Sequence, residues 1–365
     1  MRHGKRQGLL QEHVIPMMPK DVFLSCLRME EYDRIPSFIF DTSFGMSILG
    51  MPVSDIYSNG FDAELSAKSI SAGRRYLGHD AIIGSTSCGD TRVFGADVQL
   101  FPNRPPMIRK NAFSDPNSID KHSPEEIDCS ILDGIARSHI LVRNLEPDAA
   151  ILGYTPTPFL LCAVLRGIEY FLMDTMSGNG YVERLLEFSQ GVTDIITERI
   201  CSTGTCDAVM LPGAYDNIGL VGLEAIERLC IPGLRSLYRR IDKNGLPVIF
   251  HPHGTLTEDD GPKALDLFLD VGFDCIYYGE DNDHRILAEL TKGRSSIMGG
   301  VDTASTIYLG PDERVIKDTG EVLDDTSKSD FIFTCSCSVD YGLDKDRLKL
   351  MLDTVRKRVV GPAGI

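Results

Sequence analysis

The chain has 365 residues, of which 42% are hydrophobic and 25% are charged, and its formal net charge is −16. These proportions are typical of a globular protein with a sizeable core, and the length suits one large domain such as an α/β barrel. The negative net charge argues against nucleic acid or an anionic membrane as the main partner, because both attract clustered Lys and Arg.

The N-terminal region does not have the pattern of a targeting signal. Residues 1–13 are polar and basic and lack the apolar core of a secretory signal peptide. No apolar stretch reaches the roughly 18 residues that a membrane-spanning helix needs. We therefore expect a cytoplasmic protein whose ten cysteines are reduced, with a flexible arm over residues 1–17 and a single domain over residues 18–365.

Eight short apolar runs alternate with segments of helical periodicity along the chain. The runs are rich in β-branched and aromatic residues, and each ends at a polar or glycine-rich corner. They span residues 35–41, 79–85, 149–155, 207–213, 247–253, 275–281, 295–302 and 330–337. Near-continuous apolar strands that alternate with helices indicate a parallel sheet covered by helices, and eight such units predict a (β/α)8 TIM barrel.

Two segments fall outside this eightfold pattern. An N-terminal helical extension over residues 20–29 precedes the first strand, and we expect it to cover the floor of the barrel. Residues 86–148 form a long excursion between the second and third strands, and two alternating runs within it predict a hairpin. A helix over residues 124–144 should follow, because Ser123 and Glu126 have the spacing of a capping box.

Polar residues gather at the carboxyl ends of the predicted strands, where barrels build their active sites. Tyr154 and Asp216 are candidate catalytic residues that could hydrogen-bond a substrate or protonate a leaving group. Four further residues are candidate substrate contacts: Asp41, Thr86, Glu280 and Asp302. Asp41 could also orient a metal-ligating histidine, and helix capping or loop structure is the alternative role for each of these carboxylates.

The pair His251 and His253 is the most specific chemical feature of the sequence. Residues i and i+2 of a strand face the same way, so both imidazoles can point at one spot. Cys335 and Cys337 end the last predicted strand, where they should share one face, and could bring a thiolate to the same place. Imidazole and thiolate are preferred zinc ligands, and three of them leave a fourth position open, which predicts a catalytic zinc site. The alternative is that the histidines bind a substrate without a metal.

Five blocks of the sequence resemble, in order and spacing, the uroporphyrinogen decarboxylase superfamily. They lie at residues 26–40, 153–174, 251–254, 299–315 and 331–351 and together extend over nearly the whole chain. The block HPHG resembles the zinc turn of the superfamily's cobalamin-dependent methyltransferases, which act on substrates such as coenzyme M, methylamines and methyl ethers. The resemblance implies a barrel fold and the zinc ligands His251, His253 and Cys337, with Cys335 as the reserve ligand.

Departures from the superfamily's pattern distinguish between its branches. The decarboxylases carry an arginine motif after the first strand, whereas this chain has FDTSFG at residues 40–45. Thr86 and Cys337 stand at the positions of the decarboxylases' pyrrole-binding aspartate and C-terminal histidine. An octa-acidic tetrapyrrole needs cations and an acceptor for its pyrrole N–H groups, so we expect a methyltransferase rather than a decarboxylase.

The ligand set also bears on the direction of methyl transfer. The coenzyme M enzymes use one His and two Cys, and replacing a thiolate by a neutral imidazole leaves the zinc more positive and a stronger Lewis acid. We therefore expect transfer from a small donor, such as a methyl ether, to the cobalt of a corrinoid (cobalamin) supplied by a partner protein, as in an O-demethylase. The alternatives are transfer from a methylcorrinoid to a thiol such as coenzyme M or to a folate, and a metal-free ligand-binding barrel.

Overall fold

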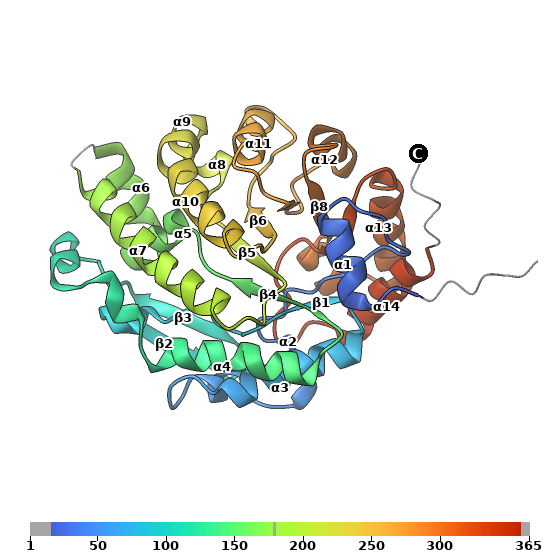
Figure 1. Cartoon of the computed structure of the whole chain (residues 1–365), viewed down its shortest axis with the longest axis horizontal. Helices are drawn as coiled ribbons and strands as arrows, with labels where there is room; N and C mark the ends of the chain where they lie inside the picture. Colours follow the sequence, from blue (N-terminus) through green and yellow to red (C-terminus); the bar gives the residue numbers. More distant parts are fainter. Residues whose placement is uncertain (1–15, 178–179, 359–365) are drawn as a thin grey trace, which may run out of the picture.

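The structure, a computed structural model, describes residues 16–177 and 180–358. Its centre is a curled, seven-stranded sheet in the order β1-β4-β5-β6-β7-β8-β9 (Figure 1). These strands are β1 (Ala81–Ile83), β4 (Ala150–Tyr154), β5 (Ala208–Gly213), β6 (Val248–Pro252), β7 (Cys275–Tyr277), β8 (Ser296–Val301) and β9 (Phe331–Cys335). All neighbouring pairs in this sheet are parallel, which confirms the prediction from the continuous apolar runs.

Residues 36–41 occupy the eighth position, between the two edge strands of the sheet. The N–H of Phe38 donates to the carbonyl of Phe333 on β9 at 2.9 Å, and the carbonyl of Ser37 accepts from Asp80, next to β1, at 2.9 Å. This first predicted strand joins its neighbours through isolated bridges rather than as a regular ladder. The fold is nevertheless TIM-barrel-like, because the segment links β1 to β9.

Side chains of the sheet alternate between the barrel interior and the layer beneath the helices, as strand geometry requires. On β6, Ile249 belongs to the interior cluster, whereas Phe250 packs outward against the rings of Phe268 and Phe273, at 4.9 and 4.8 Å between centroids. The next residue, His251, therefore points inward at the end of the strand. Burial of apolar side chains stabilises the folded state by about 25 cal/mol for each Å² of apolar surface. Because a shift of one residue would expose these side chains, their burial fixes the register of the strand.

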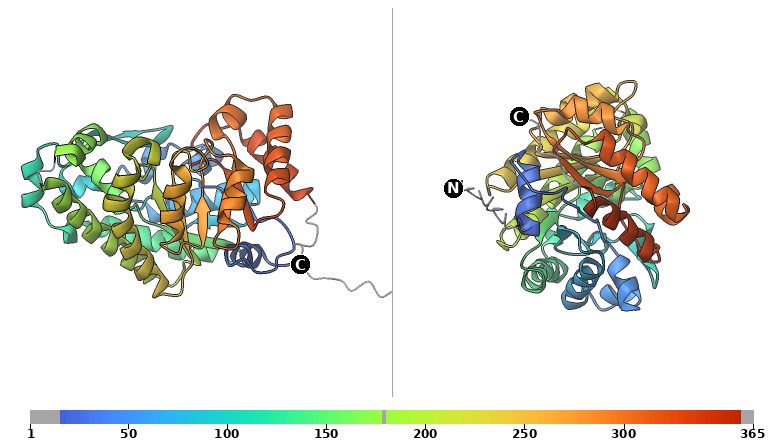
Figure 2. Two further views of the ribbon diagram at one scale, coloured as in Figure 1. Left: turned by 90° about the horizontal axis from the view of Figure 1, so that it is seen from above. Right: turned by 90° about the vertical axis from the view of Figure 1, so that its right-hand side faces the viewer.

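The longer helices lie outside the strands (Figures 1 and 2). They are α3 (Ala63–Leu77), α4 (Ser130–Leu145), α5 (Pro158–Arg166), α6 (Ile168–Ser177), α7 (Tyr181–Cys201), α10 (Ile231–Asp242), α11 (Gly261–Leu269), α12 (His284–Thr291), α13 (Asp312–Asp325) and α14 (Lys345–Arg356). Helix α14 contacts both α13 and α3, so the last helix of the layer meets the first long one. None of the helices in the described part of the chain is long and apolar enough to cross a membrane.

Short helical segments connect these elements, mostly after the carboxyl ends of strands. They are α2 (Phe44–Leu49), α8 (Ile218–Val221), α9 (Leu223–Ala225), η1 (Val53–Ile56), η2 (Thr91–Phe94), η3 (Pro116–Lys121), η4 (Pro124–Ile127), η5 (Ile226–Cys230) and η6 (Thr303–Tyr308). Two of them, η5 and η6, have π-helical geometry.

The predicted N-terminal helix is present as α1 (Pro19–Leu27). Its Phe23 and Cys26 are buried in the interior cluster, and the N–H of Lys20 donates to the carbonyl of Asp148, just before β4. The helix therefore covers the amino ends of the strands, as expected. Of the expected N-terminal arm, residues 1–15 lie outside the described residues.

The excursion after β1 contains the predicted hairpin, formed by β2 (Asp97–Phe101) and β3 (Arg104–Lys110), which pair antiparallel. The prediction of one helix over residues 124–144 is wrong in one respect. In the structure this segment forms two helices, η4 and α4, because the chain becomes extended at Cys129 (φ −133°, ψ −179°). The capping box does form, but it caps η4: the N–H of Ser123 donates to the Glu126 carboxylate at 2.9 Å.

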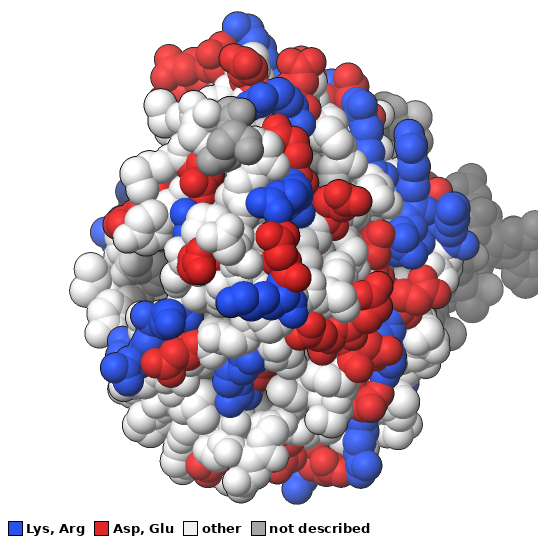
Figure 3. Space-filling model, turned by 90° about the vertical axis from the view of Figure 1, so that its left-hand side faces the viewer, with Lys and Arg blue, Asp and Glu red and all other residues white. Residues whose placement is uncertain are grey.

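Charged side chains of both signs lie interspersed on the face shown in Figure 3. Many basic groups are ion-paired, for example Arg240 with Asp194 and Arg184 with Asp120, each at 2.8 Å. Among the side chains visible on that face, Lys and Arg form no continuous basic surface of the kind that nucleic acid attracts.

Candidate functional site

His251, His253 and Cys337 converge at the carboxyl ends of β6 and β9. The centroids of the two imidazole rings are 4.7 Å apart, and Nε2 of His253 lies 3.9 Å from Sγ of Cys337. One potential ligand atom from each residue lies within 4.8 Å of the other two. The structure thus brings together the three residues that were predicted from the sequence as metal ligands.

His251 is held in one tautomer by its neighbour on β7. Its Nδ1 lies 2.8 Å from the backbone carbonyl of Tyr277, and because a carbonyl only accepts, Nδ1 carries the proton. Nε2 is buried and has no hydrogen-bond partner among the described residues. A buried, unpaired lone pair is costly unless it has a partner, so this atom suits a metal ligand.

The protonation of the three groups matches this role. Burial, together with the neighbouring His253, lowers the pKa of His251 to about 3, although the Tyr277 carbonyl opposes the shift. Burial also lowers the pKa of His253, against the charges of Glu280 and Asp281. Burial raises the pKa of the Cys337 thiol, and Glu280 adds to that shift. Both imidazoles are therefore neutral and able to ligate, while the thiol loses its proton only when a cation binds.

The donor set fits a zinc ion. Zinc accepts imidazole nitrogen at about 2.0–2.1 Å and thiolate sulfur at about 2.3 Å, which places tetrahedral ligands about 3.3–3.6 Å from one another. The His253–Cys337 separation of 3.9 Å exceeds these values by about 0.5 Å, and the largest separation in the set, at most 4.8 Å, exceeds them by up to about 1.5 Å. Modest movement of the loop that carries Cys337 would close the set, and one coordination position would remain for a substrate.

Cys335, the reserve ligand, does not share this location. It is fully buried, and its Sγ lies 3.8 Å from Sδ of Met351 on α14, in the outer layer of the barrel. The prediction that both cysteines share a face is wrong, because strand alternation ends with β9 at Cys335. Beyond that point the chain bends, and the bend turns Cys337 toward the histidines.

A cavity of about 430 Å³ lies beneath the β2–β3 hairpin. Half of its lining residues are aromatic or aliphatic, and they include Tyr57, Phe61, Leu100, Ile108 and Tyr154. Ser338, which follows Cys337 directly, also lines it. The volume of this cavity is that of a small-molecule site. We call it the hairpin cavity.

Tyr154 and Thr86 both line the hairpin cavity. Tyr154 ends β4, and burial raises the pKa of its phenol well above the usual value. Its hydroxyl makes no hydrogen bond to any other residue in the described part of the chain, so it is free to donate to a ligand. Thr86 is already engaged with Ser66 and Tyr57, whose hydroxyls lie 3.1 and 3.4 Å from its Oγ1.

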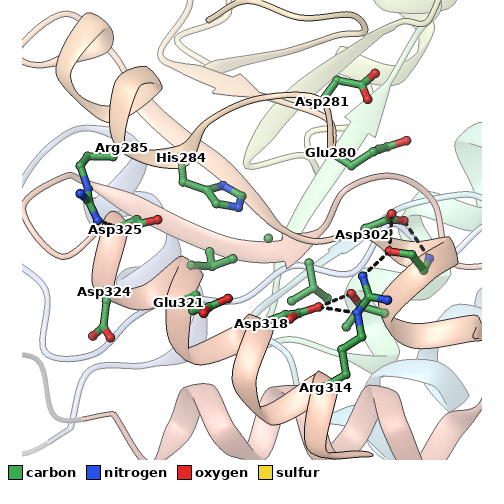
Figure 4. Close-up of a pocket in the computed structure, with 15 residues that line it drawn as sticks. Glu280, Asp281, His284, Arg285, Asp302, Arg314, Asp318, Glu321, Asp324 and Asp325 are labelled. Carbon is green, nitrogen blue, oxygen red and sulfur yellow. Dashed lines mark hydrogen bonds and ion pairs between the residues drawn. The ribbon is translucent and has the colours of Figure 1, made fainter. Parts of the chain in front are cut away.

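A second cavity, of about 680 Å³, lies between α12 and α13 (Figure 4). Glu280 and Asp302 are at its rim, and we call it the acidic cavity. Its lining includes seven carboxylate residues and two arginines, each of which pairs with one of the carboxylates. The carboxylate of Asp302 accepts from the N–H groups of Ala304 and Ser305, so this residue also caps η6.

Asp41 and Asp216 do not reach either cavity or the ligand cluster. Both oxygens of Asp41 accept from the N–H of Gly45 at 3.1 Å and lie toward α3, so this carboxylate caps α2 and does not orient a histidine. Asp216 is fully buried behind β5, where its Oδ2 accepts from Thr157 at 2.6 Å. Asp216 does not contact the ligand cluster, so the structure gives no support for the catalytic role that the sequence suggested.

Tyr277 is the contact residue that sequence reasoning missed. Its carbonyl accepts from His251, and its ring stacks on the imidazole with 3.8 Å between centroids and 15° between planes. The one available signal was the alternation within residues 275–281, which places positions 275 and 277 on the inner face of the strand.

The comparisons with known proteins agree with this fold. The Uroporphyrinogen decarboxylase (URO-D) family matches residues 18–358, and the chain belongs to this family. Among solved structures, a methyltransferase from Methanosarcina mazei is similar, with a TM-score of 0.81, 16% sequence identity, and coverage of 93% of this chain and 99% of that one. A B12-independent methionine synthase from Shewanella sp. is less similar, with a TM-score of 0.47, 13% identity, and coverage of 80% and 84%. No curated protein sequence matches this chain.

Proposed function

We propose that the protein is a zinc-dependent methyltransferase that moves a methyl group from a small, uncharged donor to the cobalt of a corrinoid protein. The observation that carries this proposal is the convergence of His251, His253 and Cys337, together with a cavity large enough for a small molecule that Ser338, the residue after Cys337, helps to line. Family membership and the similarity of the fold to the Methanosarcina mazei methyltransferase support it. A methyl ether is the donor class that the ligand set and the cavity suit best.

The chemistry at the site follows from the residues that surround the donor. Bound by the two imidazoles and the thiolate, zinc would supply a Lewis acid for the donor oxygen. The apolar walls of the hairpin cavity hold the rest of the donor and exclude water, which strengthens electrostatic contacts at the reacting oxygen. Tyr154 stays protonated because burial raises its pKa, so its hydroxyl can donate to the oxygen as negative charge develops there.

The charge around the cluster favours an uncharged donor over an anionic thiol. The only cationic side chain of the hairpin cavity is Arg92, and its guanidinium pairs with Asp90 at 2.5 Å. Asp340 adds a carboxylate to that cavity, and Glu280 faces the cluster from the acidic cavity. A sulfonate-bearing thiol such as coenzyme M would meet these carboxylates without an unpaired cation to bind it.

The same charges argue against uroporphyrinogen decarboxylation as the activity. The three arginines that line the two cavities, Arg92, Arg285 and Arg314, each pair with a carboxylate of the chain itself. An octa-acidic substrate needs several free cationic groups to hold its carboxylates. The linings of the hairpin cavity and the acidic cavity do not supply them.

The test is a methyl-transfer assay with purified, zinc-loaded protein and a Co(I) corrinoid protein, followed through the absorption change of the cobalt. We expect turnover with a methoxybenzene donor and a loss of at least about 100-fold in His251→Ala, which lacks a ligand. His284→Ala is the matched control, because His284 is another partly buried histidine, whose Nδ1 lies 2.8 Å from the Tyr278 hydroxyl instead. Equal activity of the two variants would overturn the proposal.

A second variant tests the need for Lewis acidity. His253→Cys keeps three zinc ligands but adds a second thiolate, which makes the bound ion less positive. Demethylation of the methoxy donor should slow by about tenfold or more, while metal content stays the same. Unchanged or faster turnover would contradict the proposed role of the metal.

A further inference from the structure

We propose that Tyr277 is a positioning residue that presets the metal-ligand cluster by joining the strand that carries the histidines to the strand that leads to the cysteine. The proposal rests on the proposed function, because it assigns His251, His253 and Cys337 to a metal. It concerns the shape of the site before any ion binds. Tyr277 is fully buried in the barrel interior at the end of β7, one strand away from His251 on β6.

Tyr277 fixes both the tautomer and the plane of the His251 ring. The backbone carbonyl accepts from Nδ1 at 2.8 Å, which leaves the lone pair on Nε2. The phenol ring lies nearly parallel to the imidazole, at 3.8 Å and 15°, so the ligand cannot turn without losing this contact. One residue therefore sets which nitrogen faces the cluster and in which direction it points.

The same side chain reaches across the barrel to the strand of the cysteine ligand. Its hydroxyl donates to the carbonyl of Cys335 at 2.8 Å, and Cys335 is the last residue of β9. Two residues later the chain places Cys337 at 3.9 Å from His253. The Tyr277 hydroxyl thus anchors the point at which the chain leaves the strand and turns toward the histidines.

A buried tyrosine with a bonded hydroxyl could serve stability alone, and the chain offers an internal control for that role. Tyr278, the next residue, is also buried, and its hydroxyl lies 2.8 Å from Nδ1 of His284. It belongs to the outer layer of the barrel, because neighbouring residues of a strand face opposite ways. Removing either hydroxyl deletes one hydrogen bond of 2.8 Å, but only the Tyr277 hydroxyl bonds the strand that leads to Cys337.

The experiment compares zinc affinity, measured by competition with a chelator, in the full-length wild type, Tyr277→Leu, Tyr277→Phe and Tyr278→Phe. Partners that orient a metal ligand are typically worth about 10-fold to 100-fold in metal affinity. We expect such a loss in Tyr277→Leu, partial recovery in Tyr277→Phe, which keeps the stacked ring, and a change of less than about twofold in Tyr278→Phe. Cobalt(II)-loaded protein should show shifted visible absorption bands in both Tyr277 variants only.

A second readout needs no metal. Nitrogen-15 NMR of the histidine side chains should show His251 protonated at Nδ1 in the metal-free wild type. In Tyr277→Leu its signals should broaden or shift, because the ring loses the stacked contact, whereas Tyr278→Phe should leave them unchanged.

Unchanged zinc affinity and cobalt spectra in both Tyr277 variants would overturn the inference, as would an equal loss in Tyr278→Phe. Failure of the wild type itself to bind zinc would instead remove the proposed function together with this inference. Retention of metal and methyl transfer by Tyr277→Leu would remove this inference alone.

Discussion

The imidazole of His253 and the thiol of Cys337 lie 3.9 Å apart although 84 residues separate them in the sequence. β6 and β9 are not neighbours, since β7 and β8 stand between them in the sheet. Only the curl of the sheet brings the carboxyl ends of these two strands face to face. The site is therefore a product of barrel curvature, and it depends on the register of every strand in that arc.

The two C-terminal cysteines should differ sharply in their effect on metal binding. Cys337→Ser removes the sulfur that faces the histidines and should lower bound zinc from about one equivalent to nearly none. Cys335→Ser alters a thiol that contacts Met351 in the outer layer, so it should keep its zinc and lose stability by about 1–2 kcal/mol. Metal analysis of both purified variants, together with urea denaturation, checks this prediction. Equal loss of zinc in both would contradict the geometry.

Zinc affinity should rise with pH. Burial raises the pKa of Cys337, so its thiol is protonated at neutral pH and one proton leaves when the ion binds. His251 adds nothing above about pH 5, because its pKa is lowered to about 3. Affinity should therefore increase by nearly tenfold per pH unit from about pH 6.5 to 8, measured by chelator competition. A flat profile would show that no proton is displaced.

Asp216→Asn should stabilise the fold at high pH. Burial raises the pKa of Asp216 from its ordinary value of 3.8 to about 7 in the folded state, so the folded form holds a proton that the unfolded chain releases. That contribution is present at low pH and is lost as pH rises toward and past 7. Each pKa unit corresponds to about 1.4 kcal/mol. The free energy of unfolding of Asp216→Asn, relative to that of the wild type, should therefore rise by at least about 1 kcal/mol between pH 5 and pH 8.5.

Urea denaturation of wild type and Asp216→Asn at both pH values measures this gain. Glu224→Gln, which removes an exposed carboxylate, is the control and should show no such difference. A stability difference between Asp216→Asn and wild type that is the same at both pH values would show that the buried carboxyl is not held protonated.

The hairpin cavity should bind the methyl donor through its apolar wall. Ile108→Arg places a cation in that wall and should raise the KM for a methoxybenzene donor by about tenfold, because a charged group replaces apolar contact. Met107→Arg is the matched control, since Met107 adjoins Ile108 on β3 but is 49% exposed and lies outside the cavity lining. Steady-state kinetics of both variants test the assignment. An equal change in both would place the donor elsewhere.

Much of the fold could be predicted from the sequence because burial dictates the pattern of a parallel sheet. Strands covered on both faces must be apolar throughout, and seven of the eight predicted runs form regular strands of one sheet. Residues 35–41 occupy the remaining position but pair only through isolated bridges. Helical periodicity also identified α1, whereas the break at Cys129 depends on local backbone conformation that periodicity does not report.

The candidate ligands could be predicted for a similar reason, and the errors have a clear physical cause. Strand alternation correctly placed His251 and His253 together, because β6 remains regular through Pro252. The same rule failed for Cys335 and Cys337, since β9 ends between them. Tyr277 was missed because its contact with His251 is a backbone carbonyl and a stacked ring, which leave no motif in the sequence.

X-ray absorption at the zinc edge of the purified protein tests the central claim most directly. We predict one sulfur ligand at about 2.3 Å together with two imidazole nitrogens and one further light atom at about 2.0–2.1 Å. The sulfur contribution should disappear in Cys337→Ser and persist in Cys335→Ser. A zinc environment with no sulfur, or one that loses its sulfur in Cys335→Ser instead, would contradict the proposed centre.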